Sequence, residues 1–172
     1  MMTGQQVRKE LEKFQKYVIT QARSNLTRLK KNSSKTLYDS LKGDIKYNRG
    51  DYTAKISMEY YGLFIDKGVS GKNKKYDTPY SYKSKMPPPS ALDKWIVRKG
   101  IAPRDKNGKF ITRKSLQFLI ARGIYKNGIA PSLFLTKPFD KAVATLPQDV
   151  VTAFGIDIEA WMSATVEKIN RK

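Results

Sequence analysis

The sequence predicts an α+β fold in which a long N-terminal helix packs on a small, strongly curved antiparallel sheet, with additional helices on the C-terminal side. Two patterns support this class. Apolar residues recur at every third or fourth position over residues 7–29, which is the spacing of one face of an α-helix. Apolar and polar residues then alternate over 41–47 and 52–59, which is the period of strands that bury one face.

The first element is a helix from about residue 5 to residue 31. Lys30 and Lys31 suit the negative end of its dipole, and Asn32-Ser33-Ser34 is expected to end it. Because about seven turns exceed the usual length of a globular helix, we expect it to lie across a sheet or another subunit. Its apolar face consists of Val7, Leu11, Phe14, Val18, Ala22, Leu26 and Leu29.

The alternating segments predict a hairpin with one buried face. A polar turn at 48–51 joins the two strands. A two-stranded sheet is not stable alone, so we expect the N-terminal helix to cover its apolar face and to form one core with it. That face consists of Leu41, Gly43, Ile45 and Tyr47 on the first strand and of Tyr52, Ala54, Ile56 and Met58 on the second.

Residues 68–90 are predicted to form a long basic loop, rich in tyrosine and lysine, that ends at the stiff Pro87-Pro88-Pro89. Lysine neutralises phosphates and tyrosine supplies stacking or interface contacts, so this loop is the candidate interaction element. Three interpretations stay open: a nucleic-acid contact, a protein contact, or a mobile loop kept solvated by lysine. We expect the loop to add little to the stability of the monomer. Its candidate residues are Lys72, Lys74, Lys75, Tyr76, Tyr80, Tyr82, Lys83 and Lys85.

The remainder of the chain is predicted to be mostly helical. Ser90 is a suitable N-cap for the first of these helices, Gly100 is placed to end it, and a tight turn follows at 106–109. Pro147 is expected to begin the last helix. We interpret about 90–129 as an insertion-like helical region of a single domain that comprises the whole chain. The predicted helices span about residues 90–99, 113–126, 138–146 and 147–169.

The composition excludes several classes of chemistry. The 172 residues include no cysteine and no histidine, which rules out disulfides, thiolate or imidazole metal sites, and catalytic triads that use either residue. The carboxylates of Asp39, Asp44, Glu59 and Asp66 lack the spacing of a metal-dependent nuclease site. No phosphate-binding loop of the Walker type is present. We therefore expect no enzymatic activity, no cofactor and no bound metal.

The net charge of +19 comes from 34 basic and 15 acidic residues. The excess lies in residues 1–35, with nine basic and two acidic side chains, and in residues 67–114, with fourteen and three. Such a charge favours an acidic partner. No stretch is long and apolar enough to span a membrane and no leader is recognised, so we expect a protein made in a cytoplasm.

Three short segments, in a fixed order around the predicted hairpin, share a pattern: Ser34–Lys42, Tyr60–Gly68 and Ala130–Phe139. Together with the long N-terminal helix, they resemble the head–tail joining and tail-completion proteins of tailed bacteriophages. Relative to that pattern, residues 69–129 form an insertion. The residues that match are Leu37, Ser40 and Leu41 in the first segment, Tyr61, Phe64, Ile65, Asp66 and Gly68 in the second, and Pro131, Phe134, Leu135 and Pro138 in the third.

The resemblance implies a structural virion protein without catalysis. Similar proteins form homo-oligomeric rings at the head–tail junction, between the portal or adaptor complex and the tail, around the channel through which DNA passes. It also implies assembly in the host cytoplasm and allows a contact with packaged DNA. The alternative from another functional class is a basic nucleic-acid-binding protein that acts as a monomer or dimer.

Overall fold

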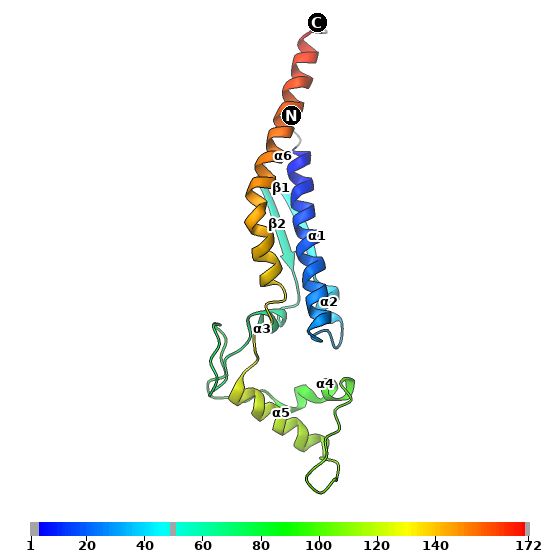
Figure 1. The fold of residues 1–172 in the computed structure, drawn as a ribbon, viewed down its shortest axis with the longest axis vertical. Helices are drawn as coiled ribbons and strands as arrows, with labels where there is room; N and C mark the ends of the chain where they lie inside the picture. Colours follow the sequence, from blue (N-terminus) through cyan, green and yellow to red (C-terminus); the bar gives the residue numbers. More distant parts are fainter. Residues whose placement is uncertain (1–3, 49–50, 171–172) are drawn as a thin grey trace. The chain divides into compact units, whose positions relative to one another are not determined.

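The computed structural model describes residues 4–48 and 51–170 and has the predicted α+β fold (Figure 1). The long N-terminal helix α1 (Gln5–Arg28) is followed by the short helix α2 (Thr36–Ser40) and by an antiparallel hairpin of β1 (Lys42–Asn48) and β2 (Asp51–Ser57). The later helices are α3 (Gly62–Lys67), the 3-10 helix η1 (Pro89–Leu92), α4 (Asp93–Arg98), α5 (Arg113–Asn127) and α6 (Thr136–Asn170).

The chain forms two compact units. Unit 1 comprises Met1–Asn25, Tyr38–Met58 and Phe134–Lys172, and unit 2 comprises Leu26–Leu37 and Glu59–Leu133. Unit 1 therefore contains most of α1, the hairpin and α6, whereas unit 2 contains α3, α4 and α5. The sequence interpretation of the chain as a single domain stays a prediction.

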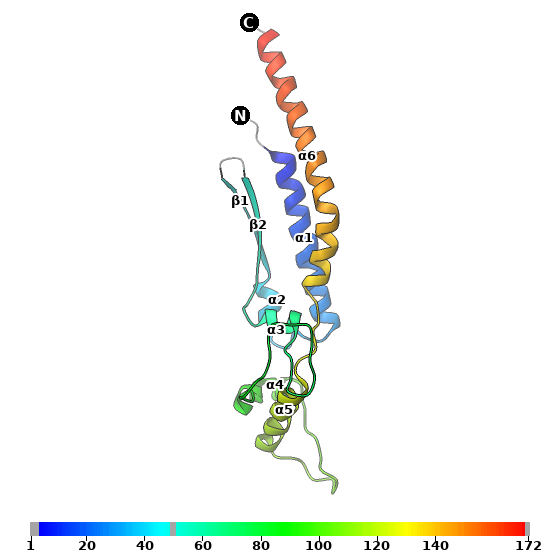
Figure 2. The ribbon, with the colours of Figure 1, turned by 90° about the vertical axis from the view of Figure 1, so that its left-hand side faces the viewer.

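In unit 1, α1 and α6 run side by side and the hairpin lies along α1 (Figure 1 and Figure 2). Val7 and Leu11 of α1 are buried against Ala153 of α6. The apolar face of α1 that the helical period predicts is thus covered by both the hairpin and α6, not by the hairpin alone. The partly buried side chains packed around this cluster are Ile45, Tyr52, Ala54, Leu146 and Val150.

The predicted alternation is found on β2 but not on β1, where Ile45 alone is half-buried and Gly43 and Tyr47, both predicted for the buried face, are exposed. Ile45 pairs with Ala54 and Tyr47 with Tyr52, and on β2 the residues at 52, 54 and 56 are half-buried while their neighbours are exposed. The Tyr47 and Tyr52 rings lie 4.8 Å apart, an aromatic cross-strand pair. Of the predicted polar turn, residues 49–50 lie outside the described residues.

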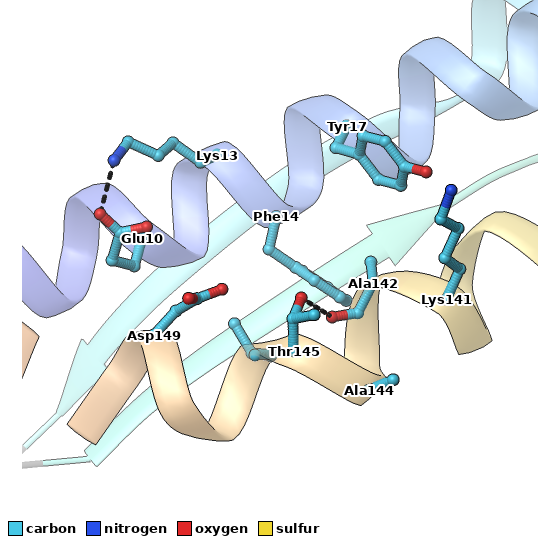
Figure 3. A pocket seen from close by; sticks show the side chains of 10 residues that line it. Glu10, Lys13, Phe14, Tyr17, Lys141, Ala142, Ala144, Thr145 and Asp149 are labelled. Atoms are coloured by element: carbon cyan, nitrogen blue, oxygen red, sulfur yellow. Dashed lines mark hydrogen bonds and ion pairs between the residues drawn. The ribbon is translucent and has the colours of Figure 1, made fainter. Parts of the chain in front are cut away.

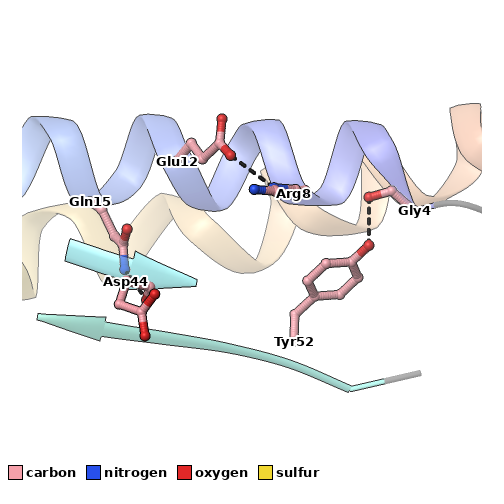
Figure 4. A network of polar contacts seen from close by, with 6 residues as sticks. All are labelled: Gly4, Arg8, Glu12, Gln15, Asp44 and Tyr52. Carbon is pink, nitrogen blue, oxygen red and sulfur yellow. Dashed lines mark hydrogen bonds and ion pairs between the residues drawn. The ribbon is translucent and has the colours of Figure 1, made fainter. Parts of the chain in front are cut away.

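Gln15 fastens α1 to both strands. Its side chain is buried, and its amide nitrogen donates to the Asp44 carbonyl at 2.7 Å and to the Lys55 carbonyl at 3.1 Å (Figure 4). Gly43 makes this approach possible, since a Cβ there would lie 2.6 Å from the Gln15 Oε1. At the other end of the hairpin, the Tyr52 hydroxyl donates to the Gly4 carbonyl at 2.8 Å. Burial is the main cause that raises the pKa of this phenol, so the donor stays protonated well above neutral pH.

Asp157 of α6 caps the N-terminus of α1 from the far end of the chain. Its buried carboxylate accepts from the Gln6 amide at 3.1 Å and from the Val7 amide at 3.3 Å. These amides belong to the first turn, which has no intrahelical partners for its N–H groups and carries the positive end of the helix dipole. The carboxylate therefore stabilises α1 and fixes the register of α6 against it.

Replacing Asp157 by alanine should lower the free energy of unfolding by about 2 kcal/mol, because the first turn of α1 loses charge-assisted hydrogen bonds. Asp157→Asn, which keeps an acceptor but no charge, should fall between Asp157→Ala and the wild type. The exposed Glu159, two residues further along α6, provides the control: Glu159→Ala should change stability by less than about 0.5 kcal/mol. Urea denaturation measures all three, and equal effects of D157A and E159A would contradict the cap.

Pro147 does not begin the last helix as predicted, because it lies inside the continuous helix α6. A proline removes one backbone hydrogen bond and normally breaks a helix. Here the flanking residues Leu146 and Val150 pack on the unit-1 core, and this burial holds the helix together on both sides of the proline. The predicted division at Pro147 into two helices was therefore wrong.

Two further boundaries differ from the prediction. Helix α1 ends at Arg28 instead of about residue 31, because Lys30 adopts a positive φ of 53° and the Lys31 amide donates to the Leu26 carbonyl at 2.9 Å. Ser90 is not an N-cap, since it lies inside η1, which begins at Pro89. Gly100 does follow the end of α4, as predicted, with a φ of 62°.

Unit 2 has a small core of its own. Ile96 of α4 and Leu116 and Ala121 of α5 are buried. Helix α5 begins with Thr112, whose side chain accepts from the Ser115 amide at 3.2 Å. The Gln117 side chain donates to the Asp93 carboxylate at 2.6 Å, which ties α5 to the first residue of α4.

Candidate interaction surfaces

The second and third motif segments meet in unit 2. The Asp66 carbonyl accepts from the Leu133 amide at 3.0 Å, and the Ser132 hydroxyl donates to the Ile65 carbonyl at 2.6 Å. Gly68 has a φ of 76°, and a Cβ there would lie 2.6 Å from the Ile129 carbonyl oxygen. The Ser132–Ile65 hydrogen bond thus joins residues 67 apart in the sequence, and the close approach of the backbone at Ile129 requires glycine at position 68.

Most of the remaining motif residues are buried or half-buried within their unit. Leu37 in unit 2 and Leu41 in unit 1 are buried. Arg23 of α1 donates to the Leu41 carbonyl at 3.0 Å, and Asn25 donates to the Phe134 carbonyl at 3.1 Å. Phe134 is 1% exposed. Pro138 is also buried, Ser40, Phe64, Ile65 and Leu135 are half-buried, Asp66 is buried, and Tyr61 and Pro131 are exposed.

The predicted loop begins with a segment that is firmly attached to α5 and the residues after it. We call residues 68–82 the strap. Val69 and Ile129 exchange two backbone hydrogen bonds of 2.8 Å, and the Lys72 amide donates to the Tyr125 carbonyl at 2.9 Å. Within the strap, the Ser70 amide donates to the Tyr80 carbonyl at 2.8 Å, and the Tyr82 amide donates to the Ser70 carbonyl at 2.9 Å.

Tyrosines and lysines of the strap have different environments. The Tyr80 ring packs edge-on against Phe64 at 4.7 Å, and burial raises the pKa of the Tyr82 phenol. The Lys74 ammonium lies 5.4 Å from the Tyr76 ring centre. Tyr76, Tyr80 and Tyr82 are half-buried, whereas Lys72, Lys74, Lys75, Lys83 and Lys85 are exposed.

The expectation that the loop adds little to monomer stability is therefore wrong for the strap. Residues 68–71 are buried, and their backbone groups are paired with Ile129, Tyr80, Tyr82 and Lys74. The lysine-rich sequence of the loop did not indicate this anchoring, because the groups that pair belong to the backbone and the buried residues are small. The exposed lysines remain available for a partner.

Gly128→Ala should destabilise the protein by clearly more than Gly108→Ala. Both glycines have a positive φ, 72° and 78°, so both variants carry the conformational cost of about 1 kcal/mol. Only at Gly128 would the added Cβ collide with the backbone of the strap, at Val69 and Gly71, because Gly108 has open space around it. Thermal denaturation compares the two variants, and equal shifts in melting temperature would contradict a tightly anchored strap.

A row of apolar side chains lies on α6, four of them exposed and one, Ile158, half-buried. We call Val151, Phe154, Ile158, Trp161 and Met162 the α6 apolar stripe. They follow one another at helical spacing, and Phe154, Trp161 and Met162 are 48%, 48% and 55% exposed. The helical period reveals an apolar face on this segment, but only the structure shows that the face is uncovered.

Unit 1 also has two apolar grooves. One, of about 600 Å³, lies between α1 and α6, where Phe14, Tyr17 and Leu146 form its apolar wall and Lys13 and Asp149 lie at its edges (Figure 3). The other, of about 680 Å³, is bordered by Tyr47, Tyr52 and Val150 and includes Val151 and Phe154 of the stripe. A groove beside an exposed apolar stripe is typical of a protein–protein contact.

In residues 4–48 and 51–170, no three acidic side chains come together as metal ligands. None of the helices described here combines the length and the apolarity needed to cross a membrane. Comparison with protein-family profiles, with curated proteins and with solved structures gave no match.

Proposed function

We propose that this chain is a structural protein of the phage neck, which self-associates in a ring and joins the portal-side complex to the tail around the DNA channel. Its site of action is then the head–tail junction of the virion. The α6 apolar stripe carries this proposal, because an exposed apolar face of this size marks a contact with another protein.

The occupant we assign to the stripe is a second copy of the chain. The last turns of α6 extend past the N-terminal end of α1 (Figure 1). A helical segment of a few turns has only marginal stability in water unless it packs against another surface. Charge favours the same assignment: residues 145–172 carry three basic and four acidic side chains, whereas residues 1–35 carry nine and two. The α6 end of one copy is thus electrostatically suited to the exposed side of α1 in the next.

A contact between two different surfaces also explains a ring. The stripe and the groove between α1 and α6 are separate parts of unit 1, so one copy can offer its stripe to the groove of its neighbour. Such a head-to-tail contact repeats around an axis and closes when the rotation permits, whereas a self-complementary contact gives a dimer. Two separate apolar surfaces, the stripe and the groove between α1 and α6, therefore favour the neck protein over the alternative, a nucleic-acid-binding monomer or dimer.

Trp161→Glu should weaken self-association, because it places a charge in the centre of the contact. Ser163→Glu provides a control of equal charge, since Ser163 is exposed on the other side of α6. Sedimentation velocity at increasing concentration should show larger species for the wild type and for S163E, and a shift toward the monomer for W161E. Circular dichroism should show equal helix content in all three. Identical behaviour of W161E and S163E would remove the stripe from the interface.

The proposed location at the head–tail junction is tested on assembled phage particles. In tailed particles whose genome encodes this chain, quantitative mass spectrometry should give several copies per virion, and antibody labelling should mark the head–tail junction. Assembly with W161E should give DNA-filled heads that lack tails, because the ring that joins head and tail is weakened. A single copy per virion, or labelling elsewhere on the particle, would overturn the neck assignment.

A further inference from the structure

A narrow hairpin connects α4 and α5 in unit 2. We call residues 103–111 the basic hairpin. Its two sides pair between Arg104 and Phe110, with the Ile111 amide donating to the Pro103 carbonyl at 3.0 Å and the Asp105 amide donating to the Lys109 carbonyl at 2.7 Å. Residues 104–110 are all exposed. The hairpin is thus an ordered projection, not a slack connection.

The single carboxylate of the hairpin is engaged inside the turn. One oxygen of Asp105 accepts from the Asn107 amide at 2.8 Å and from the Lys109 amide at 2.9 Å. Asp105 therefore organises the turn and forms none of the ion pairs found among the described residues. Lys106 and Lys109, on either side of Gly108, are held at the tip without a carboxylate partner there.

Two contacts hold the Arg104 guanidinium in place and use only part of its N–H donors. Its guanidinium lies 3.9 Å from the centre of the Phe110 ring and donates one hydrogen bond, of 2.7 Å, to the Gly108 carbonyl. A guanidinium has five N–H donors, so stacking and one bond leave most of them directed outward. Phe110, which is 62% exposed, holds the arginine extended and leaves the ring edge accessible.

The charge around the hairpin is almost entirely of one sign. From Arg98 to Lys114 there are seven basic residues and one acidic residue, Asp105. Among the described residues of this stretch, Arg113 forms an ion pair with Asp93 at 3.7 Å, a distance at which an exposed pair is weak. A partner for this surface must bring many negative charges at regular spacing.

We propose that the basic hairpin binds the phosphate backbone of double-stranded DNA without sequence preference, through Arg104, Lys106 and Lys109. A rigid, narrow projection with cations on both sides of its tip suits a groove lined by two phosphate rows. An acidic protein is less suited, because Phe110 is the single exposed aromatic side chain of the hairpin and Arg104 stacks on one face of it, whereas the three cations are all exposed. This binding site is independent of the neck assignment and of the α6 apolar stripe.

The test compares the wild type with Lys106→Gln/Lys109→Gln by fluorescence anisotropy, using two labelled 30-bp duplexes of unrelated sequence at 50–300 mM salt. The wild type should bind both duplexes equally, with an affinity that falls as salt rises. The double variant should lower the slope of log K against log salt by about two, because each lost phosphate contact accounts for about 0.9. Both side chains are exposed, so the thermal midpoint should not change.

Two controls carry the same loss of charge. Lys9→Gln/Lys16→Gln, on the exposed side of α1, should leave the affinity and the slope unchanged, and so should Lys72→Gln/Lys75→Gln in the strap. An equal effect in all three variants would mean that only net charge matters and would overturn the site. So would a loss confined to the strap variant, no binding to either duplex, or binding to poly-glutamate as tight as to DNA. Sedimentation of the hairpin variant keeps this result separate from self-association, which should be unaffected.

Discussion

The burial of one face of α1 from two sides is the constraint on which unit 1 depends. Val7 and Leu11 lie against the hairpin and against Ala153 of α6, so neither neighbour can leave without exposing the helix. Polar contacts then fix positions that apolar packing alone does not determine. Gln15 fixes where both strands lie along α1, and Asp157 fixes the position of α6 along α1. Because apolar contact is not directional and hydrogen bonds are, the two together select one arrangement.

Unit 2 is organised differently, mainly by its backbone. The strap, the end of α5 and the segment that leads to α6 are held by hydrogen bonds between main-chain groups, several of them at glycines that no larger residue can replace. Backbone pairing thus anchors the strap while its lysine side chains stay exposed to solvent. The lysine side chains take no part in these backbone hydrogen bonds, so a partner can contact them without disturbing the packing beneath.

The two proposed contacts differ in physical character and therefore respond differently to conditions. In the proposed self-association, the α6 apolar stripe buries hydrocarbon, a contribution little affected by salt, and the charge difference between the α6 end and α1 adds a salt-dependent one. The basic hairpin depends on charge and on the release of counterions, so its binding falls steeply as salt rises. A protein that joins other proteins beside DNA benefits from this separation, because the assembly persists while contacts with a moving polyanion form and break quickly.

The sequence by itself determined the α+β class, the long first helix, the hairpin and the half-buried face of β2, because the periods of 3.6 and 2 depend only on local geometry. It also placed α5 and identified the exposed lysines of the strap. Pro147 inside α6, the Asp157 cap on α1 and the buried start of the strap were decided by tertiary structure, since each depends on residues far apart in the chain. The uncovered stripe belongs to the same group: the spacing of Ile158 and Trp161 predicts an apolar face on the last helix, but only the packing of the other elements decides which part of this helix stays exposed.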